Sequence, residues 1–194
     1  ETVRPDGRLD VARIEAGRLE LKLTDCDLRG LARGVVELFR SESPRHDLVF
    51  LEPETPVQVR CDEGRIEQAL GNLVSNAIKY SPGGGEVRVE VSRRGGEALV
   101  KVSDQGIGIA SDAIPLLFQP YSRLFRERPG VRGVGLGLFI TKGIVEAHGG
   151  RVEVASDEAS TRFFSSKLRL SFGLNQWLQS MIPLAASGNS LTNL

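Results

Sequence analysis

The stretch Asn72-Leu73-Val74-Ser75-Asn76-Ala77-Ile78-Lys79-Tyr80 decides how the rest of this chain is interpreted. It ends a longer segment, residues 65–80, in which apolar residues recur at the spacing of an amphipathic helix. At about 100° per residue, Asn72, Asn76 and Lys79 share one narrow face of that helix, while the apolar residues point roughly the opposite way. The sequence therefore predicts a packed helix that carries two amides and an ammonium group on a polar stripe.

This polar stripe has two interpretations. Asparagine is a middling helix former whose side chain competes for the backbone, so two asparagines one turn apart need a reason. A solvated helix face is one explanation. The other is that an asparagine carbonyl oxygen binds Mg²⁺, which keeps most of its waters and takes further oxygens from phosphates, with Lys79 beside the anion.

A first glycine-rich segment, Asp104-Gln105-Gly106-Ile107-Gly108, directly follows a predicted strand. An aspartate at a strand end can reach into a pocket and accept a hydrogen bond from an exocyclic amine, while the glycines let a planar ring approach. A capped turn explains the same residues equally well.

A second glycine-rich segment, Gly133-Val134-Gly135-Leu136-Gly137-Leu138, opens another predicted helix. Exposed backbone N–H groups and the helix dipole at such a site favour a phosphate chain. The spacing differs from Gly-x-Gly-x-x-Gly, and no Gly-Lys-Ser/Thr follows, which disfavours a dinucleotide-binding loop and a Walker-type loop.

The remaining elements alternate between helices and strands. Asp27 can cap a helix that ends before Ser43-Pro44, and a hairpin follows the glycines at residues 83–85. These elements predict an α+β sandwich in which helices cover an antiparallel-rich sheet. The helices expected besides 65–80 cover residues 9–19, 28–39 and 138–147, and the strands cover 48–51, 57–60, 87–91, 99–102, 152–154 and 162–170.

Composition excludes several classes of protein. Lys+Arg and Asp+Glu are equal at 25 each in the 194 residues, so no charge excess favours nucleic acid or an acidic membrane surface. Cys26 and Cys61 lie far apart, without a Cys-x-x-Cys spacing or a His cluster, which predicts free thiols in a reducing compartment. No run approaches the roughly 18 to 20 apolar residues of a membrane helix, and no signal peptide opens the chain. Residues 170–194 carry no charge, which fits a partner-binding strip, a packed extension, a non-native stretch or a disordered tail.

The order of these parts is more specific than any one of them. An asparagine-bearing helix, a hairpin, Asp-x-Gly-x-Gly, an aromatic and arginine-rich loop and a Gly-x-Gly-x-Gly helix together resemble the histidine kinase branch of the superfamily that also holds gyrase, Hsp90 and MutL. The resemblance covers roughly residues 9–154. It implies a Bergerat-type sandwich, in which a mixed, largely antiparallel sheet is covered on one face by helices.

Asn72 separates the branches of this superfamily. The stretch at 72–80 resembles the asparagine box of the kinases, whereas gyrase-like branches carry glutamate at the position of Asn72. An amide cannot take a proton from water, so the resemblance implies phosphoryl transfer from ATP in place of brisk hydrolysis.

The resemblance also implies roles for single residues. It assigns Mg²⁺ coordination to Asn76, support of the phosphates to Asn72 and a phosphate contact to Lys79. It places Tyr80 against the nucleotide and Asp104 on the adenine amino group. The further ATP-binding residues that it implies, in the two glycine segments and the aromatic loop between them, are Gly106, Gly108, Tyr121, Arg123, Gly133, Gly135, Leu136 and Gly137.

The partners follow from the same resemblance. Residues 11–17 resemble the end of a dimerisation helix hairpin, which gives a division into residues 1–22, a catalytic domain at 23–170 and a tail at 171–194. The acceptor histidine expected upstream is missing, since only His46 and His148 occur. The expected function is the cytoplasmic catalytic domain of a sensor histidine kinase that homodimerises in its full-length form, phosphorylates its own dimerisation domain and supplies a response regulator. A non-catalytic ATP-sensing or interaction module of the same fold is the alternative.

Overall fold

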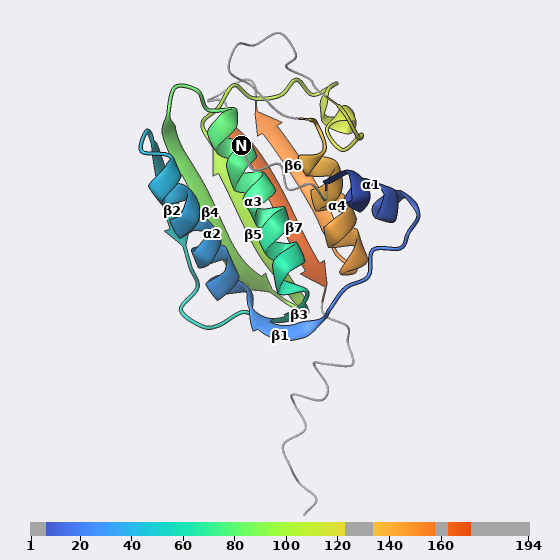
Figure 1. The fold of residues 1–194 in the computed structure, drawn as a ribbon. Coiled ribbons are helices and arrows are strands. Elements are labelled where there is room, and N and C mark those ends of the chain that lie inside the picture. Colours follow the sequence, from blue (N-terminus) through green and yellow to red (C-terminus); the bar gives the residue numbers. More distant parts are fainter. Residues whose placement is uncertain (1–6, 123–133, 158–162, 172–194) are drawn as a thin grey trace, which may run out of the picture.

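A computed structural model of the chain describes residues 7–122, 134–157 and 163–171. In this part, a five-stranded sheet in the order β2-β4-β5-β7-β6 carries helices on one face (Figure 1). The β2–β4 pair is parallel and the other pairs of this sheet are antiparallel, which confirms the predicted α+β class. The elements are α1 (Gly7–Glu15), β1 (Thr24–Asp27), α2 (Leu28–Glu42), β2 (His46–Leu51), β3 (Gln58–Cys61), α3 (Glu63–Lys79), β4 (Gly85–Arg94), β5 (Glu97–Asp104), a short 3₁₀ helix (Ile114–Leu116), α4 (Gly137–Ala147), β6 (Arg151–Asp157) and β7 (Phe163–Ser171).

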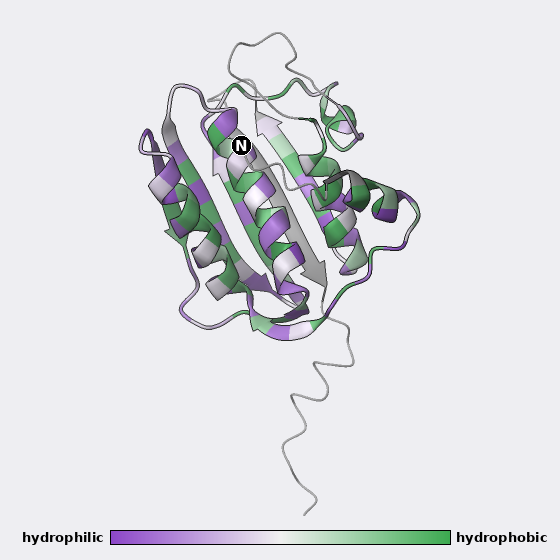
Figure 2. Ribbon diagram, in the orientation of Figure 1, coloured by the Kyte–Doolittle hydropathy of each residue, from purple (hydrophilic) through white to green (hydrophobic). Residues whose placement is uncertain are grey.

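Helix α3 is the central helix of the covering layer, as its periodicity predicts. Asp62 caps its N-terminus by accepting the N–H of Arg65 at 3.1 Å. Figure 2 shows hydrophilic and hydrophobic residues alternating along the helix. The apolar positions that bury α3 against the sheet are Ile66, Ala69, Leu70, Leu73, Val74 and Ala77.

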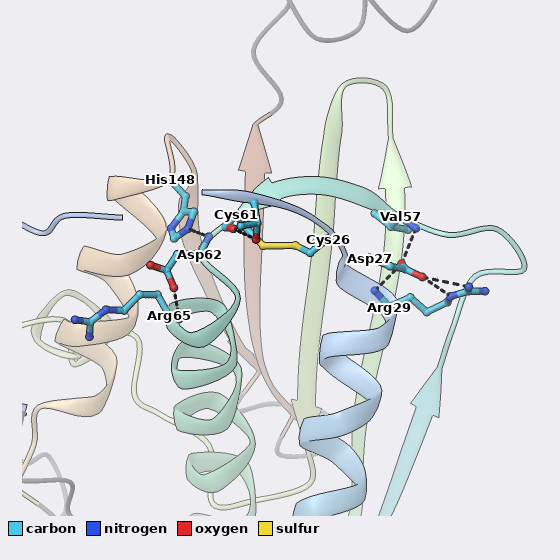
Figure 3. The surroundings of a disulfide bond; sticks show 9 residues. Cys26, Asp27, Arg29, Val57, Cys61, Asp62, Arg65 and His148 are labelled. Carbon is cyan, nitrogen blue, oxygen red and sulfur yellow. Dashed lines mark hydrogen bonds and ion pairs between the residues drawn. A yellow bond between two sulfur atoms is a disulfide. The ribbon is translucent and has the colours of Figure 1, made fainter. Parts of the chain in front are cut away.

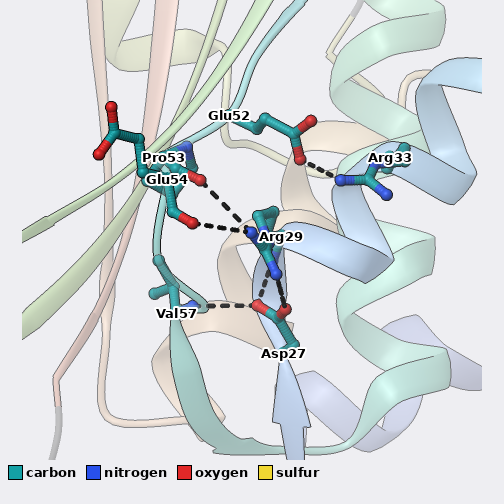
Figure 4. A network of polar contacts seen from close by, with 7 residues as sticks. All are labelled: Asp27, Arg29, Arg33, Glu52, Pro53, Glu54 and Val57. Carbon is teal, nitrogen blue, oxygen red and sulfur yellow. Dashed lines mark hydrogen bonds and ion pairs between the residues drawn. The ribbon is translucent and has the colours of Figure 1, made fainter.

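Helix α2 begins at the predicted cap, Asp27. Its carboxylate accepts the backbone N–H of Arg29 at 3.1 Å and that of Val57 at 3.0 Å (Figure 4). The Arg29 guanidinium pairs with the same carboxylate at 3.2 Å and also donates to the carbonyls of Pro53 and Glu54. One aspartate therefore fixes both the start of α2 and the segment that leads into β3.

The two cysteines form a disulfide, so the prediction of free thiols is wrong (Figure 3). The cause is β1, a strand that the sequence pattern does not reveal, which pairs with β3 in a separate antiparallel two-stranded sheet. Cys26 lies opposite Val59 and Cys61 lies opposite Thr24, so the cysteines are diagonal neighbours with Cα atoms 6.7 Å apart. Separation by 35 residues in sequence thus gave no guide to their separation in space.

This disulfide closes a loop of the unfolded chain, and we expect its reduction to lower the free energy of unfolding by roughly 2–4 kcal/mol. Urea unfolding with and without a reductant measures the difference. A Cys26→Ser, Cys61→Ser double variant should unfold at the same urea concentration in both conditions, because the chain has 2 cysteines and the reductant then has no target. If the urea midpoint of the unaltered chain is the same with and without the reductant, the disulfide does not stabilise the fold.

The end of α4 is tied to the start of α3 through His148. The ring Nδ1 lies 2.7 Å from the carbonyl oxygen of Ile144, which can only accept, so Nδ1 carries the proton. Nε2 then accepts the backbone N–H of Asp62 at 3.0 Å (Figure 3). Burial alone would raise the pKa of the Asp62 carboxyl, but the N–H groups of Lys22 and Arg65 and the Arg65 charge together lower it.

Helix α1 packs on the domain with a face different from the apolar one that its sequence suggests. The apolar residues Leu9, Ala12, Ala16 and Leu19 recur at helical spacing, yet Leu9 is 50% exposed. Asp10, in contrast, is buried and pairs with Arg65 at 2.8 Å. Ile14 lies against Gly143 of α4, where a Cβ atom would come within 2.5 Å of the isoleucine side chain. The predicted helix also stops earlier than expected, at Glu15.

Among the residues that the structure describes, no helix combines the length and the apolar character needed to cross a membrane.

Candidate functional site

The structure brings the three predicted chemical motifs together at one end of the sandwich. The carbonyl of Tyr80, at the end of α3, accepts the N–H of Ile107 in the segment after β5 at 3.0 Å. The amide nitrogen of Asn72 donates to the carbonyl of Gly137 at the start of α4 at 3.2 Å. In Figure 1 this end lies opposite the β1–β3 sheet. Helix α3 is therefore hydrogen-bonded to both glycine segments.

The polar face of α3 is partly buried, since Asn72, Asn76 and Lys79 are each of intermediate exposure. Asn72 Nδ2 also reaches Thr141 Oγ1 at 3.4 Å, so this nitrogen faces two acceptors on α4. Within the described part of the chain, the Asn76 carboxamide makes no hydrogen bond or ion pair. Lys79 Nζ lies 5.2 Å from the centroid of the Tyr80 ring. Asn72 is thus held as a donor, whereas no partner engages the Asn76 carboxamide within the described residues.

Asp104 ends β5 and is only 1% exposed. Its Oδ1 accepts the N–H of Gly106 at 2.9 Å and faces the Ser81 hydroxyl at 3.4 Å. Burial raises the pKa of this carboxyl to about 6, against the opposing effect of these two donors. The group is therefore mostly ionised at neutral pH and can accept a hydrogen bond from an amine.

The two glycines after Asp104 are required for different structural reasons. A Cβ atom at Gly106 would lie 2.3 Å from the Tyr80 carbonyl oxygen and 2.7 Å from Asp104 Oδ1, so a side chain does not fit between α3 and the carboxylate. Gly108 has φ +68°, a conformation that favours glycine. The backbone of this segment therefore lies close to Tyr80 and Asp104, at the place where the planar ring of a ligand is expected.

The second glycine segment leads into an uncapped helix. Gly135 has φ +76°, and a Cβ atom there would lie 2.5 Å from the Ser122 carbonyl oxygen. The N-cap of α4 is Leu136, which offers no side-chain acceptor, so the first N–H groups of the helix are left for another acceptor. The side chain of Leu136 is buried in the core, so a nucleotide contact at this residue falls to its backbone.

The aromatic residues Phe118 and Tyr121 lie between the two glycine segments in the sequence. Lys142 Nζ lies 5.8 Å from the centroid of the Phe118 ring. Tyr121 is 52% exposed and has φ 61°, which is uncommon for a residue other than glycine. Arg123 and Gly133, predicted as ATP-binding residues, lie outside the residues that the structure describes.

Sequence reasoning missed two polar residues of this site. Thr141 is fully buried, and its hydroxyl oxygen accepts a hydrogen bond from the Asn72 amide. A threonine among the apolar residues of α4 could have indicated this contact from the sequence. Ser81 is 2% exposed and lies beside Asp104. Because Pro82 and Gly83 follow it, the sequence predicted only that the helix ends there.

Comparison with known proteins agrees with this geometry. Residues 61–172 match the family described as histidine kinase-, DNA gyrase B-, and HSP90-like ATPase. The histidine protein kinase DivJ of Caulobacter vibrioides is 33% identical over 150 residues, which cover 76% of this chain and 25% of that protein. The solved structure of the mycobacterial sensor histidine kinase MprB has a TM-score of 0.66 and 31% identity, covering 77% of this chain and 97% of that chain. Full-length ShkA in complex with AMPPNP has a TM-score of 0.70 and 30% identity, covering 86% of this chain and 35% of that chain.

The matched segment spans more than half of the chain and includes the asparagine-bearing helix and both glycine segments. The chain therefore belongs to the family of histidine kinase-, DNA gyrase B- and HSP90-like ATPases, and relatives such as DivJ and MprB are histidine kinases. The expected family resemblance is confirmed, and this is an ATP-binding domain of that family. The chain spans less than a third of the length of the curated relatives it matches, at 20–29% for three of them.

Proposed function

We propose that this chain is the catalytic domain of a two-component sensor histidine kinase, which binds Mg-ATP and donates the γ-phosphoryl group to a histidine on a dimerisation domain. The nucleotide would lie across the C-terminal half of α3, with its adenine at Asp104 and its phosphates at the start of α4.

The observation that carries this proposal is the bonding of Asn72. Its Nδ2 donates to the Gly137 carbonyl at 3.2 Å and reaches Thr141 Oγ1 at 3.4 Å. A glutamate carboxylate at this position has no N–H to donate and would place its oxygen lone pairs against the Gly137 carbonyl oxygen, which is unfavourable. The surroundings of residue 72 therefore suit an amide. An amide cannot deprotonate water, which favours transfer of the phosphoryl group over hydrolysis.

The residues present fit Mg²⁺. Among the described residues, no cluster of three or more His, Cys, Asp or Glu side chains could hold a metal ion. Mg²⁺ commonly binds through one or two protein oxygens together with substrate phosphates and waters, and Asn76 offers such an oxygen. When bound, the ion would offset the charge of the phosphates. Asn76 would orient it, Asn72 would fix α4 against α3, and the first N–H groups of α4 would hold the phosphates in line for transfer.

The acceptor must come from outside the described residues. The chain has 2 histidines, and both ring nitrogens of each are engaged. His46 bonds Ser43 and the Ser81 carbonyl, and His148 bonds Ile144 and Asp62. Phosphorylation of either ring would break a structural hydrogen bond, which supports a separate acceptor domain.

We further propose the partners and the location that the family implies. The domain would act on the dimerisation domain of its own homodimeric full-length protein, which would pass the phosphoryl group to a response regulator. The disulfide removes the cysteine argument for a reducing compartment. The need for ATP as phosphoryl donor still supports a cytoplasmic location.

Transfer of radiolabel from γ-labelled ATP tests this function. We expect this chain, mixed with the dimerisation domain of its own full-length protein, to produce an acid-labile, Mg²⁺-dependent phosphohistidine on that domain. Tight ATP binding without any transfer would favour an ATP-sensing module. Steady phosphate release without labelling would instead favour a gyrase-like ATPase.

A further inference from the structure

A buried serine connects the adenine side of the proposed site to the edge of the sheet. Ser81 directly follows the C-cap residue of α3 and is 2% exposed. Its hydroxyl donates to Asp104 Oδ1 at 3.4 Å. Its backbone carbonyl accepts the N–H of Gly84 at 2.9 Å and lies 2.8 Å from His46 Nε2. The side chain of Ser81 thus contacts Asp104, while its backbone carbonyl contacts His46.

His46 is fixed at both ring nitrogens. A carbonyl oxygen only accepts, so His46 Nε2 carries a proton and donates a hydrogen bond to the Ser81 carbonyl. His46 Nδ1 lies 2.8 Å from Ser43 Oγ, in the turn that precedes β2. His46 also pairs with Gly85 in the parallel β2–β4 register. The turn before β2 and the segment after α3 therefore hold each other in place.

The contact between Ser81 and Asp104 lies in tightly packed surroundings. A Cβ atom at Gly106 would come within 2.9 Å of Ser81 Oγ, in addition to its clashes with Asp104 and Tyr80. Asp104 Oδ1 accepts the Gly106 N–H at 2.9 Å, so the Ser81 hydroxyl is the second donor to the same oxygen. Two donors on Oδ1 fix the rotation of the carboxylate and leave its other oxygen to recognise a ligand.

We infer that Ser81 is a positioning residue that orients Asp104 toward the adenine amino group, and that His46 fixes Ser81 from the edge strand β2. The inference rests on the proposed ATP site and adds what determines its base recognition. Selectivity for the amino group then depends on a hydrogen-bonded chain from Ser43 through His46 and Ser81 to Asp104.

Calorimetric titration of this chain with ATP and with purine riboside triphosphate, which lacks the amino group, tests the inference. Ser81→Ala should weaken ATP binding roughly 3- to 10-fold and binding of the analogue less than about 2-fold, because only ATP loses an oriented acceptor. Ser81→Thr keeps the hydroxyl and should restore the preference for ATP. Ser75→Ala, at an exposed position of α3, should leave both affinities unchanged.

A second variant keeps the inference falsifiable if Ser81→Ala does not fold. His46→Ala should lower the ratio of ATP to analogue affinity in the same direction, by roughly 2- to 5-fold. Equal losses for both nucleotides, or an unchanged ratio in the variants that fold, would overturn the positioning role. Failure of the unaltered chain to bind either nucleotide would instead refute the proposed function, and equal affinity for both would refute the adenine contact together with this inference.

Discussion

Replacing Asp104 with asparagine is expected to stabilise the nucleotide-free domain at about pH 7.5, raising its free energy of unfolding by roughly 2–3 kcal/mol. The pKa of this buried carboxyl is raised from 3.8 to about 6, so ionisation is less favourable in the folded chain than in the unfolded one. Between these values the folded state binds more protons, and its stability falls as pH rises. An amide of the same shape avoids that cost and can still accept from Gly106 and Ser81.

The same substitution should weaken ATP binding by roughly 10- to 100-fold, the value of one or two charge-assisted hydrogen bonds. If the asparagine oxygen keeps the Gly106 N–H, its NH₂ group turns toward the adenine amine, and two donors then face each other. Stability and affinity therefore change in opposite directions at Asp104.

Urea unfolding at two pH values, together with calorimetric titration of ATP, checks both halves of this prediction. The stability gain should be largest above about pH 7, should shrink as the pH falls through about 6, and should be lost only below 3.8, where the aspartate becomes protonated in the unfolded state as well. A variant that is less stable at pH 7.5, or that binds ATP as tightly as the unaltered chain, would contradict the assignment of Asp104.

Asn76→Ala should reduce phosphoryl transfer by roughly 100-fold or more, since it removes the proposed protein oxygen on Mg²⁺. It should also remove most of the strengthening of ATP binding by Mg²⁺. Folding should be intact, because the Asn76 carboxamide has no hydrogen bond within the described residues and alanine is the better helix former.

Labelling of the acceptor domain and ATP titration with and without Mg²⁺ measure these effects, with Ser75→Ala as the matched control on an exposed position of α3. Phosphohistidine formed by Asn76→Ala at the unaltered rate would refute the metal ligand assignment.

Much of this fold can be predicted from local sequence, because local periodicity determines it. Helix α3 has a continuous apolar face, and Asp27 has the chemistry of a cap, so both were predicted and both are observed. The hairpin of β4 and β5 follows from alternating valines on either side of a Gly-Gly turn. Each of these features depends on residues that are close in sequence.

Features that depend on distant residues could not be predicted. Strand β1 is four residues long and becomes a strand only by pairing with β3, so the disulfide was missed along with it. Asp10 is buried only because Arg65 and Gln68 of α3 satisfy its carboxylate, at 2.8 and 3.0 Å. No spacing within α1 indicates that contact.

The candidate site divides in the same way. The order of the motifs along the chain and the polar stripe of α3 predicted which residues form the site. Which atoms each residue engages needed the structure, since the pairing of Asn72 with Gly137 and of Ser81 with Asp104 spans 65 and 23 residues.

Titration of the isotopically labelled chain with Mg-ATP, followed by backbone amide NMR shifts, tests the central claim most directly. The account predicts saturable shifts that concentrate on residues 72–81, 104–108 and 134–138, with little change in the β1–β3 sheet at the opposite end of the sandwich. Shifts that concentrate in β1 and β3, or the absence of saturable shifts at α3 and the two glycine segments, would contradict it.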